Sequence, residues 1–557
     1  TRDERYARAA RAYIEDWLRE DPYATATTAR SGDNMLTLSI RLGSSMTPGW
    51  GGALAVFLDS PTFDDAFVKR VLDSMERQAD YLARHLTAYG NFRIAQLDSL
   101  VLTALRFPFL PGAGRMLETG ISGMRNALAT QFLPDGVHIE RTPSYAGWMT
   151  NVIANYLLLP KIDPAADAHA DPRMLVRALD YGAQSELFGV NDASAAYRDP
   201  EAFSRLRSRA EMIRRLGLEA PAEPPLDQSF PYAGQVFSRT SWSPGADYLA
   251  FDASTWGGGH GHLSRLSLVL RSGGRALVAD PGILTYEMSD PFGPYGKSTE
   301  AHSTLNVNGG NQSGADARLL RADFTRHAAL IQARYQGGYW SGRYGWSFGQ
   351  GRGAGAWGDH ERIVLWIKGE YALVIDSMAA DPGAEIRNVW QLGPMDKWSQ
   401  DPARLAWWSE NSDVNLALEM IVPPPKTSMR IYDGQREPLR GWLGVRGAEH
   451  IPAPQVEFRY PSARSAVTSV VLLAPYKAAR PRFEPRYGTR NSIHHLEIGP
   501  DHFAWSTGLL LPVDDGQPFF TNAVFVWQRK GSPEKGLLAG GTYLRVLPLQ
   551  APAIARE

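Results

Sequence analysis

Apolar residues recur three and four positions apart through the first part of the chain. One such stripe runs through Phe67, Val71, Met75, Ala79 and Leu82. This spacing places the apolar side chains on one face of a helix. The same period recurs in six further segments: Tyr6–Leu18, Ile94–Phe107, Met116–Phe132, Trp148–Leu159, Met174–Tyr181 and Phe203–Leu216. Short connections with Pro or Gly separate several of these segments, so we expect antiparallel helical hairpins stacked as a solenoid or closed into an (α/α) toroid.

The pattern changes after a Pro-rich stretch at residues 216–230. Beyond it, short apolar runs and period-two alternation are typical of β strands, as at residues 248–251, 266–270, 276–279, 363–367, 371–375 and 469–473. We therefore predict an α+β multidomain protein. A helical domain, either a solenoid or an (α/α) toroid, would span residues 1–220. A large antiparallel β-sandwich would span residues 230–557, with room for a small C-terminal sheet.

Composition narrows the class of protein. The 557 residues hold 58 Lys+Arg against 59 Asp+Glu, which is not the basic excess that a nucleic-acid partner requires. No run of about eighteen apolar residues predicts a membrane span. The chain has no Cys, which excludes disulfides, thiol catalysis and Cys-ligated zinc. The sequence does not indicate an oligomeric state. It opens at Thr1, and because a processed start would already have lost any signal peptide, the sequence does not indicate whether the protein is exported.

The densest polar cluster of the predicted β domain begins at Trp256 and contains His260 and His262, with Asp280 and His302 further along the chain. The two closely spaced histidines would share one face if they lie on a strand. Neutral imidazoles and a carboxylate are ligands that zinc prefers, so His262, Asp280 and His302 would supply three ligands from successive strands. The alternative is that these histidines lie at strand ends and form ordinary hydrogen bonds.

A second polar cluster lies in the predicted helical domain. Asn91 stands near the start of one helix, and residues 135–145, which end at Tyr145, precede another. In one interpretation these residues contact a ligand. In the other, Asn91 caps its helix and Tyr145 lies at a rim with its hydroxyl in water. Neither cluster has a nucleotide fingerprint, a P-loop or a nucleophile elbow.

Five motifs, taken in order, resemble those of the heparinase II/III-like polysaccharide lyases, a family that also includes exo-acting oligoalginate lyases. They read Gly90-Asn91-Phe92, Asp135-Gly136 to Tyr145, His260-Gly261-His262, Asp280-Pro281-Gly282 and Ala301-His302-Ser303-Thr304. The resemblance implies a carbon–oxygen lyase that cleaves a uronic-acid-containing acidic polysaccharide by β-elimination and leaves a C4=C5 unsaturated uronate. Such polymers lie outside the cytoplasm, so it also implies a periplasmic or secreted protein.

The resemblance further implies roles for residues of the helical domain. Asn91 would hydrogen-bond the uronate carboxylate and stabilise the charge that builds on it, with Arg93 or Arg141 nearby. Tyr145 would transfer protons between C5 and O4 of the substrate, and His260 of the β domain is a second proton-transfer candidate.

In the β domain, Tyr295 resembles a tyrosine that some members of the family use as an acid/base. Tyr286 is a less favoured choice from the same loop, and either ring would alternatively line the cleft. Trp256 would contact the substrate. The family's structural divalent metal, usually zinc, would bind to the two histidines and the aspartate named above, at positions 262, 280 and 302.

Two departures from the family pattern bear on these expectations. Phe92 stands where many members have His, so neutralisation of the carboxylate would fall to Arg93. Ser264 stands where many members have Asp, which predicts a weaker set of contacts behind the metal ligands. Two other functions remain open: a non-catalytic carbohydrate-binding relative, and a glycoside hydrolase with Glu140 and Asp280 as its paired carboxylates.

Overall fold

The computed structural model describes residues 3–19, 35–159, 171–193, 204–315, 317–341, 355–445, 449–490, 493–506, 519–521, 523–540 and 544–546. The chain divides into two compact units, Thr1–Ala183 with Ser204–Ala222, and Gln184–Phe203 with Glu223–Glu557. We call them the helical unit and the β unit. The segment Gln184–Phe203 belongs to the β unit. The sequence analysis predicted a single boundary at residues 220–230, which assigned this segment to the helical domain.

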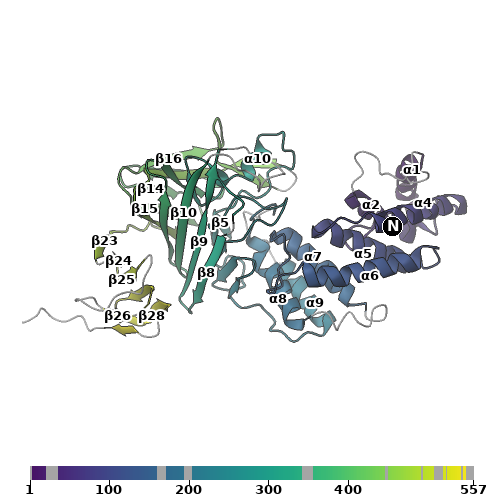
Figure 1. Cartoon of the computed structure of the whole chain (residues 1–557), viewed down its shortest axis with the longest axis horizontal. Coiled ribbons are helices and arrows are strands. Elements are labelled where there is room, and N and C mark those ends of the chain that lie inside the picture. Colours follow the sequence, from purple (N-terminus) through teal and green to yellow (C-terminus); the bar gives the residue numbers. More distant parts are fainter. Residues whose placement is uncertain are drawn as a thin grey trace, which may run out of the picture. The chain divides into compact units, whose positions relative to one another are not determined.

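The helical unit consists of α helices joined mainly by short loops (Figure 1). They are α1 (Glu4–Leu18), α2 (Met35–Leu42), α3 (Gly49–Phe57), α4 (Asp65–Arg84), α5 (Gly90–Arg106), α6 (Ala113–Thr130), α7 (Pro143–Leu157), α8 (Pro172–Gln184) and α9 (Ser204–Leu216). The seven segments with helical period all form helices. The period did not indicate α2 or α3, because α2 is short and α3 begins after Pro48 and contains three glycines, residues that favour turns.

Helix α5 lies at the centre of the helical unit. Twelve of its 17 residues are buried. Leu100 packs in one apolar cluster with Phe67 of α4, and Ile94 packs in a second cluster with Met124 of α6 and Val152 of α7. This packing fixes the N-terminus of α5, where Asn91 lies.

The β unit contains several antiparallel sheets (Figure 1). A five-stranded sheet has the order β1 (Asp227–Phe230), β2 (Gln235–Arg239), β3 (Tyr248–Asp252), β4 (Ser267–Ser272) and β5 (Arg275–Val278). A nine-stranded sheet has the order β13 (Trp398–Asp401), β14 (Ala406–Ser409), β15 (Asn415–Val422), β22 (Val467–Tyr476), β11 (Tyr371–Ala380), β10 (Ala356–Ile367), β9 (Ala328–Trp340) and β7 (Asn311–Gln312), and β8 (Ala317–Phe324) also pairs with β9.

Further sheets complete the β unit. A four-stranded sheet has the order β16 (Ser428–Asp433), β21 (Pro454–Pro461), β12 (Glu385–Gln391) and β6 (Leu305–Val307). A C-terminal sheet has the order β23 (Arg486–Arg490), β24 (Ile493–Ile498), β25 (Asp501–Trp505), β27 (Phe525–Arg529) and β28 (Ser532–Ala539). The remaining pairs are β17 (Gln435–Arg436) with β18 (Leu439–Arg440), β19 (Trp442–Val445) with β20 (Glu449–Pro452), and β26 (Phe519–Thr521) with β29 (Leu544–Val546).

The nine-stranded sheet is the middle layer, because both of its faces are apolar. Side chains alternate between the two faces of a strand. In β10, Trp366 packs with Phe251 of the five-stranded sheet, whereas Leu365 on the other face packs in a separate cluster with Phe503 of the C-terminal sheet. The sequence of helical array and antiparallel sheets is the predicted α+β architecture.

Candidate functional site

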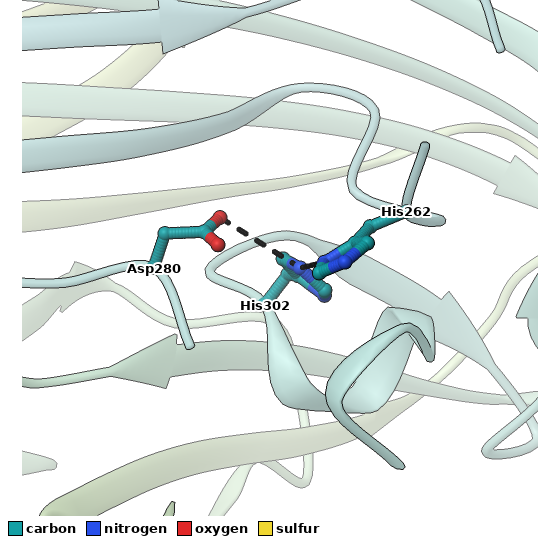
Figure 2. A group of neighbouring side chains, drawn as sticks. All are labelled: His262, Asp280 and His302. Atoms are coloured by element: carbon teal, nitrogen blue, oxygen red, sulfur yellow. Dashed lines mark hydrogen bonds and ion pairs between the residues drawn. The ribbon is translucent and has the colours of Figure 1, made fainter. Parts of the chain in front are cut away.

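Three predicted metal ligands meet in the β unit (Figure 2). His262 lies in the loop between β3 and β4, Asp280 follows β5, and His302 follows a short 3-10 helix, η3 (Thr299–Ala301). All three residues are buried, and one ligand atom from each lies within 4.8 Å of the others. The sequence placed these residues on successive strands, and that detail is wrong, because all three lie in connections beyond the strand ends.

The His-Gly-His segment is a loop and not a strand. Gly258, two residues before His260, has a φ of 96°, a left-handed conformation that breaks an extended run. His262 is buried, whereas His260 is only partly buried, so the two side chains do not share a strand face. A Cβ atom on Gly261 would lie 2.9 Å from the ring of Trp256, so the glycine between the histidines makes room for this indole.

Hydrogen bonds fix which nitrogen of each buried ring faces the cluster. His302 Nδ1 lies 2.7 Å from the carbonyl oxygen of Ser298, which only accepts, so Nδ1 carries the proton. His262 Nε2 lies 2.8 Å from the Asp192 carboxylate and donates to it in the same way. The two remaining nitrogens, His262 Nδ1 and His302 Nε2, lie 3.2 Å apart. Each therefore directs a lone pair towards the other.

The charge state of the cluster follows from its burial. Burial lowers the pKa of His262 to about 4 and that of His302 well below its ordinary value, so both rings are neutral near pH 7. Burial also raises the pKa of Asp280 well above its ordinary value. One Asp280 oxygen accepts the Gly282 amide at 3.0 Å, and the other lies 3.7 Å from His302 Nε2. No Lys or Arg among the described residues pairs with Asp280. Two imidazole lone pairs and such a carboxylate are a donor set that fits a divalent metal such as zinc.

Two residues behind the cluster were not identified from the sequence. Asp192 and Lys297 form a buried ion pair, with Lys297 Nζ 2.6 Å from the Asp192 oxygen that also contacts His262. Burial raises the pKa of Asp192, but Lys297 and His262 outweigh it and the net shift is downward. Asp192 lies 70 residues before His262 in the chain, and nothing in one sequence links the two.

Asp192 also overturns one expectation about Ser264. We predicted that a serine in place of the family's aspartate would weaken the contacts behind the histidines. The structure supplies the missing carboxylate to His262 from Asp192 instead. The Ser264 hydroxyl donates to Asp252, 3.2 Å away.

In the helical unit, Glu140 joins the two predicted motifs. The backbone N–H of Asn91 donates to Glu140 Oε1 at 2.9 Å. Gly90 has a φ of 86°, and a Cβ atom there would lie 2.7 Å from the same carboxylate oxygen, so both its conformation and its space favour glycine. The start of α5 and the 135–145 segment are therefore held together by a buried carboxylate.

Asn91 does not cap its helix. The N-cap residue of α5 is Tyr89, and Asn91 is the second residue of the helix. Asn91 is 3 % exposed, and within the described part of the chain its side-chain Nδ2 has no hydrogen-bond partner. A buried amide donor that is left unpaired is costly, and such groups gather where a ligand completes them.

Tyr145 and the two arginines lie in the same unit. Tyr145 is the third residue of α7 and is partly buried, with its ring centre 6.2 Å from that of Trp148. Arg141 precedes this helix with a φ of 51° and is partly exposed. Arg93 is partly exposed and donates to the Thr87 carbonyl oxygen at 2.8 Å.

Tyr295 lies in surroundings that argue against a role in proton transfer. Its ring packs in an apolar cluster with Leu284 and Phe292, and its hydroxyl accepts the Gly441 amide N–H at 3.1 Å. Burial raises the pKa of Tyr295 to about 12. This is the environment of a structural tyrosine, and we no longer assign it a catalytic role. Tyr286 of the same connection is exposed.

Among the described residues, no helix combines the length and the apolar character that crossing a bilayer would require.

Two family models match the chain. Heparinase II/III N-terminus matches residues 1–169, and Heparinase II/III-like, C-terminal matches residues 222–438. A curated relative, heparin-sulfate lyase of Pedobacter heparinus, is 23 % identical over 455 residues, which are 78 % of this chain and 66 % of that relative.

Solved structures show the same fold. Heparan sulfate lyase HepC from Pedobacter heparinus superposes with a TM-score of 0.61 at 20 % identity, over 89 % of this chain and 78 % of that one. A crystal structure of heparinase III gives a TM-score of 0.75 at 15 % identity, over 90 % of this chain and 79 % of that one. An N-terminal (α/α) toroid followed by an antiparallel β-sandwich is thus the fold of this chain. With both terminal family models matched in order, the chain belongs to the heparinase II/III-like family.

Proposed function

We propose that this chain is a polysaccharide lyase that cleaves a uronic-acid-containing polysaccharide by β-elimination and leaves a C4=C5 unsaturated uronate. Membership of the family and the curated heparin-sulfate lyase relative support this class of reaction. The observation that carries the mechanism is the buried, unpaired Nδ2 of Asn91 at the N-terminus of α5.

Asn91 is suited to stabilise a uronate carboxylate. The C5 proton of a uronate is weakly acidic, because its removal adds charge next to an existing carboxylate. An amide donor at this position would stabilise that charge, and the N-terminus of α5 adds its partial positive charge. One preorganised donor of this kind is worth about 3 kcal/mol in the transition state. Arg93 and Arg141 are the cations that we place beside the carboxylate.

Tyr145 is our first choice for proton transfer. As phenolate it would take the C5 proton; the C–H electron pair then forms the C4=C5 bond, the C4–O4 bond breaks, and O4 accepts a proton. His260, on the glycine-rich loop of the β unit, is the second candidate for one of these two transfers.

We also propose that His262, Asp280 and His302 hold a structural divalent metal, zinc by ligand chemistry. When bound, the metal supplies the positive charge that two facing lone pairs and a carboxylate lack. The ligands come from the β3–β4 and β5–β6 connections, so the cluster ties together the two loops that carry His260 and Lys297. We place the protein in the periplasm or outside the cell, where such polymers occur.

A glycoside hydrolase is not favoured. It needs two carboxylates with free access to the scissile bond. Glu140 accepts the backbone N–H of Asn91, and Asp280 is one of the three proposed metal ligands. Neither carboxylate is therefore available as an acid or base for hydrolysis.

The test is an ultraviolet assay of the purified protein on heparan sulfate, other uronate-containing glycosaminoglycans, alginate and bacterial exopolysaccharides. Elimination creates a conjugated C4=C5 double bond, so absorbance should rise with time on at least one polymer. Release of new reducing ends without that absorbance would overturn the proposal. Tyr145→Phe, checked for normal folding, is the matched inactive control.

A further inference from the structure

We propose that Asp192 and Lys297 are positioning residues that hold the 259–263 segment, so that one buried ion pair orders both the metal ligand His262 and the proton-transfer candidate His260. We call residues 259–263 the histidine loop. The inference rests on the proposed function for the role of His260 and on the proposed metal for the role of His262.

The Asn191-Asp192 dipeptide contacts the histidine loop in three places. The backbone N–H of Asp192 donates to the His260 carbonyl oxygen at 3.1 Å. The Asn191 side-chain oxygen accepts the backbone N–H of His262 at 2.8 Å. The Asp192 carboxylate accepts from the His262 ring at 2.8 Å. Asn191 adopts a left-handed φ of 62°, a conformation uncommon for a residue other than glycine, and the fold retains it at this contact.

Lys297, the other member of the ion pair, also contacts the histidine loop. Its Nζ donates to Asp192 at 2.6 Å and to the Gly259 carbonyl oxygen at 3.1 Å. Its own carbonyl oxygen accepts the backbone N–H of Leu263 at 3.0 Å. Asp192 and Lys297 together therefore fix both ends and the middle of the histidine loop.

The loop needs this support because of its composition. Gly259 and Gly261 lie in the histidine loop, and Gly257 and Gly258 directly precede it; these glycines give the backbone more conformational freedom than other residues would. Ordering such a segment costs conformational entropy, which the five hydrogen bonds offset. Lys297 and the Asp192 side chain are at most 1 % exposed, so removal of one partner leaves the other as an uncompensated buried charge.

We expect changes at Asp192 and at Lys297 to have different effects. Asp192 contacts a metal ligand directly, so its change should alter metal affinity. Lys297 contacts the Gly259 carbonyl next to His260, so its change should loosen His260 and lower turnover more than substrate binding.

The experiment compares Asp192→Asn and Lys297→Met with Lys368→Met. Lys368 forms a similar pair with Asp227, with the same 2.6 Å separation, elsewhere in the β unit. Metal-stripped proteins are titrated with Zn²⁺ against a chromophoric chelator, and kcat and KM are measured on the polymer that the wild type cleaves. We expect Asp192→Asn to weaken Zn²⁺ binding about 10- to 100-fold. Lys297→Met should lower kcat about tenfold or more with little change in KM, by analogy with other misplaced catalytic groups.

The control should match the wild type in both measurements. Wild-type Zn²⁺ affinity in Asp192→Asn together with wild-type kcat in Lys297→Met would overturn the inference. A wild type that binds no Zn²⁺ would overturn the metal assignment and this inference together, whereas a wild type that binds Zn²⁺ but cleaves no polymer overturns only the proposed function, and the metal titration still decides.

Asn191→Ala provides a milder variant if the charge changes prevent folding. It removes one acceptor from the His262 backbone and leaves the ion pair intact. A severalfold loss of Zn²⁺ affinity in a normally folded Asn191→Ala protein supports the inference, and an unchanged affinity contradicts it.

Discussion

The Nδ1 atom of His262 lies 3.2 Å from the Nε2 atom of His302, although the opposite nitrogen of each ring already donates to a fixed acceptor. Two imidazole acceptors at this distance repel each other unless a cation lies between or beside them. The carboxylate of Asp280 borders the same space. A positive charge at this position would remove the repulsion, so we expect a bound cation there.

Chelation of the metal should destabilise the β unit. A ligand that binds only the folded state at 100 to 1,000 times its Kd contributes about 2.7 to 4.1 kcal/mol of stability. We expect the Tm to fall by several degrees in a strong chelator and to recover when Zn²⁺ is restored. His302→Ala is the control, since chelator should not lower its Tm further. An equal Tm for the wild type with and without chelator would contradict the metal assignment.

The sequence predicted the fold more fully than the site. Periodicity located the strands at 248–251 and 363–367, because a half-buried or fully buried strand has a simple hydrophobic signature. It missed helix α3, where burial of Leu54 in the core outweighs a Pro and three glycines that favour turns.

The sequence predicted which three residues meet in the candidate metal cluster, but not the residues that contact them from behind. His262, Asp280 and His302 stand in short motifs and meet as expected. Asp192 and Lys297 carry no local signal, since a buried ion pair between distant segments exists only after the chain has folded. The sequence around Tyr295 resembles that of the family's acid/base tyrosine, yet the side chain lies in an apolar cluster.

Tyr145→Phe should abolish most of the lyase activity. A positioned acid or base contributes about 10² to 10⁴ in rate, so we expect kcat to fall at least a hundredfold. Tyr295→Phe is the matched control, because it removes a hydroxyl that accepts one backbone hydrogen bond from Gly441. That variant should keep its kcat and lose about 1 kcal/mol of stability. The opposite ranking of the two kcat values would return the proton-transfer role to Tyr295.

Asn91→Ala should lower kcat/KM without harming the fold. The Nδ2 atom makes no hydrogen bond to any residue that the structure describes, so its removal leaves no described group newly unpaired. Loss of one transition-state donor is expected to lower the rate about 10²- to 10³-fold. Steady-state kinetics and thermal unfolding would be measured together. Full activity in Asn91→Ala, with or without a fall in Tm, would show that the amide has no role in the reaction.

Acid should destabilise the β unit partly through His360. This side chain is fully buried beside Asp376, with its Nε2 2.7 Å from the carboxylate, and burial lowers its pKa despite that partner. The unfolded chain takes up a proton near its ordinary pKa of about 6.5, whereas the folded chain takes one up only at a lower pH, so stability is complete above pH 6.5 and falls as the pH drops below it.

His360→Gln removes this proton but retains a donor to Asp376. We expect the metal-free variant to lose less stability than the metal-free wild type between pH 7 and pH 5, by about 1 kcal/mol. Urea unfolding at the two pH values measures the difference. Equal losses in the two proteins would show that His360 does not titrate on unfolding in this range.

The mass of the product tests the central claim most directly. Elimination splits the chain without adding water, so the unsaturated fragment is one water lighter than the matching product of hydrolysis. We predict that mass spectrometry of the digest will show this lighter fragment at the new non-reducing end, with no solvent ¹⁸O incorporated when cleavage takes place in labelled water. Fragments of the full hydrolytic mass that carry ¹⁸O from the solvent would contradict the account.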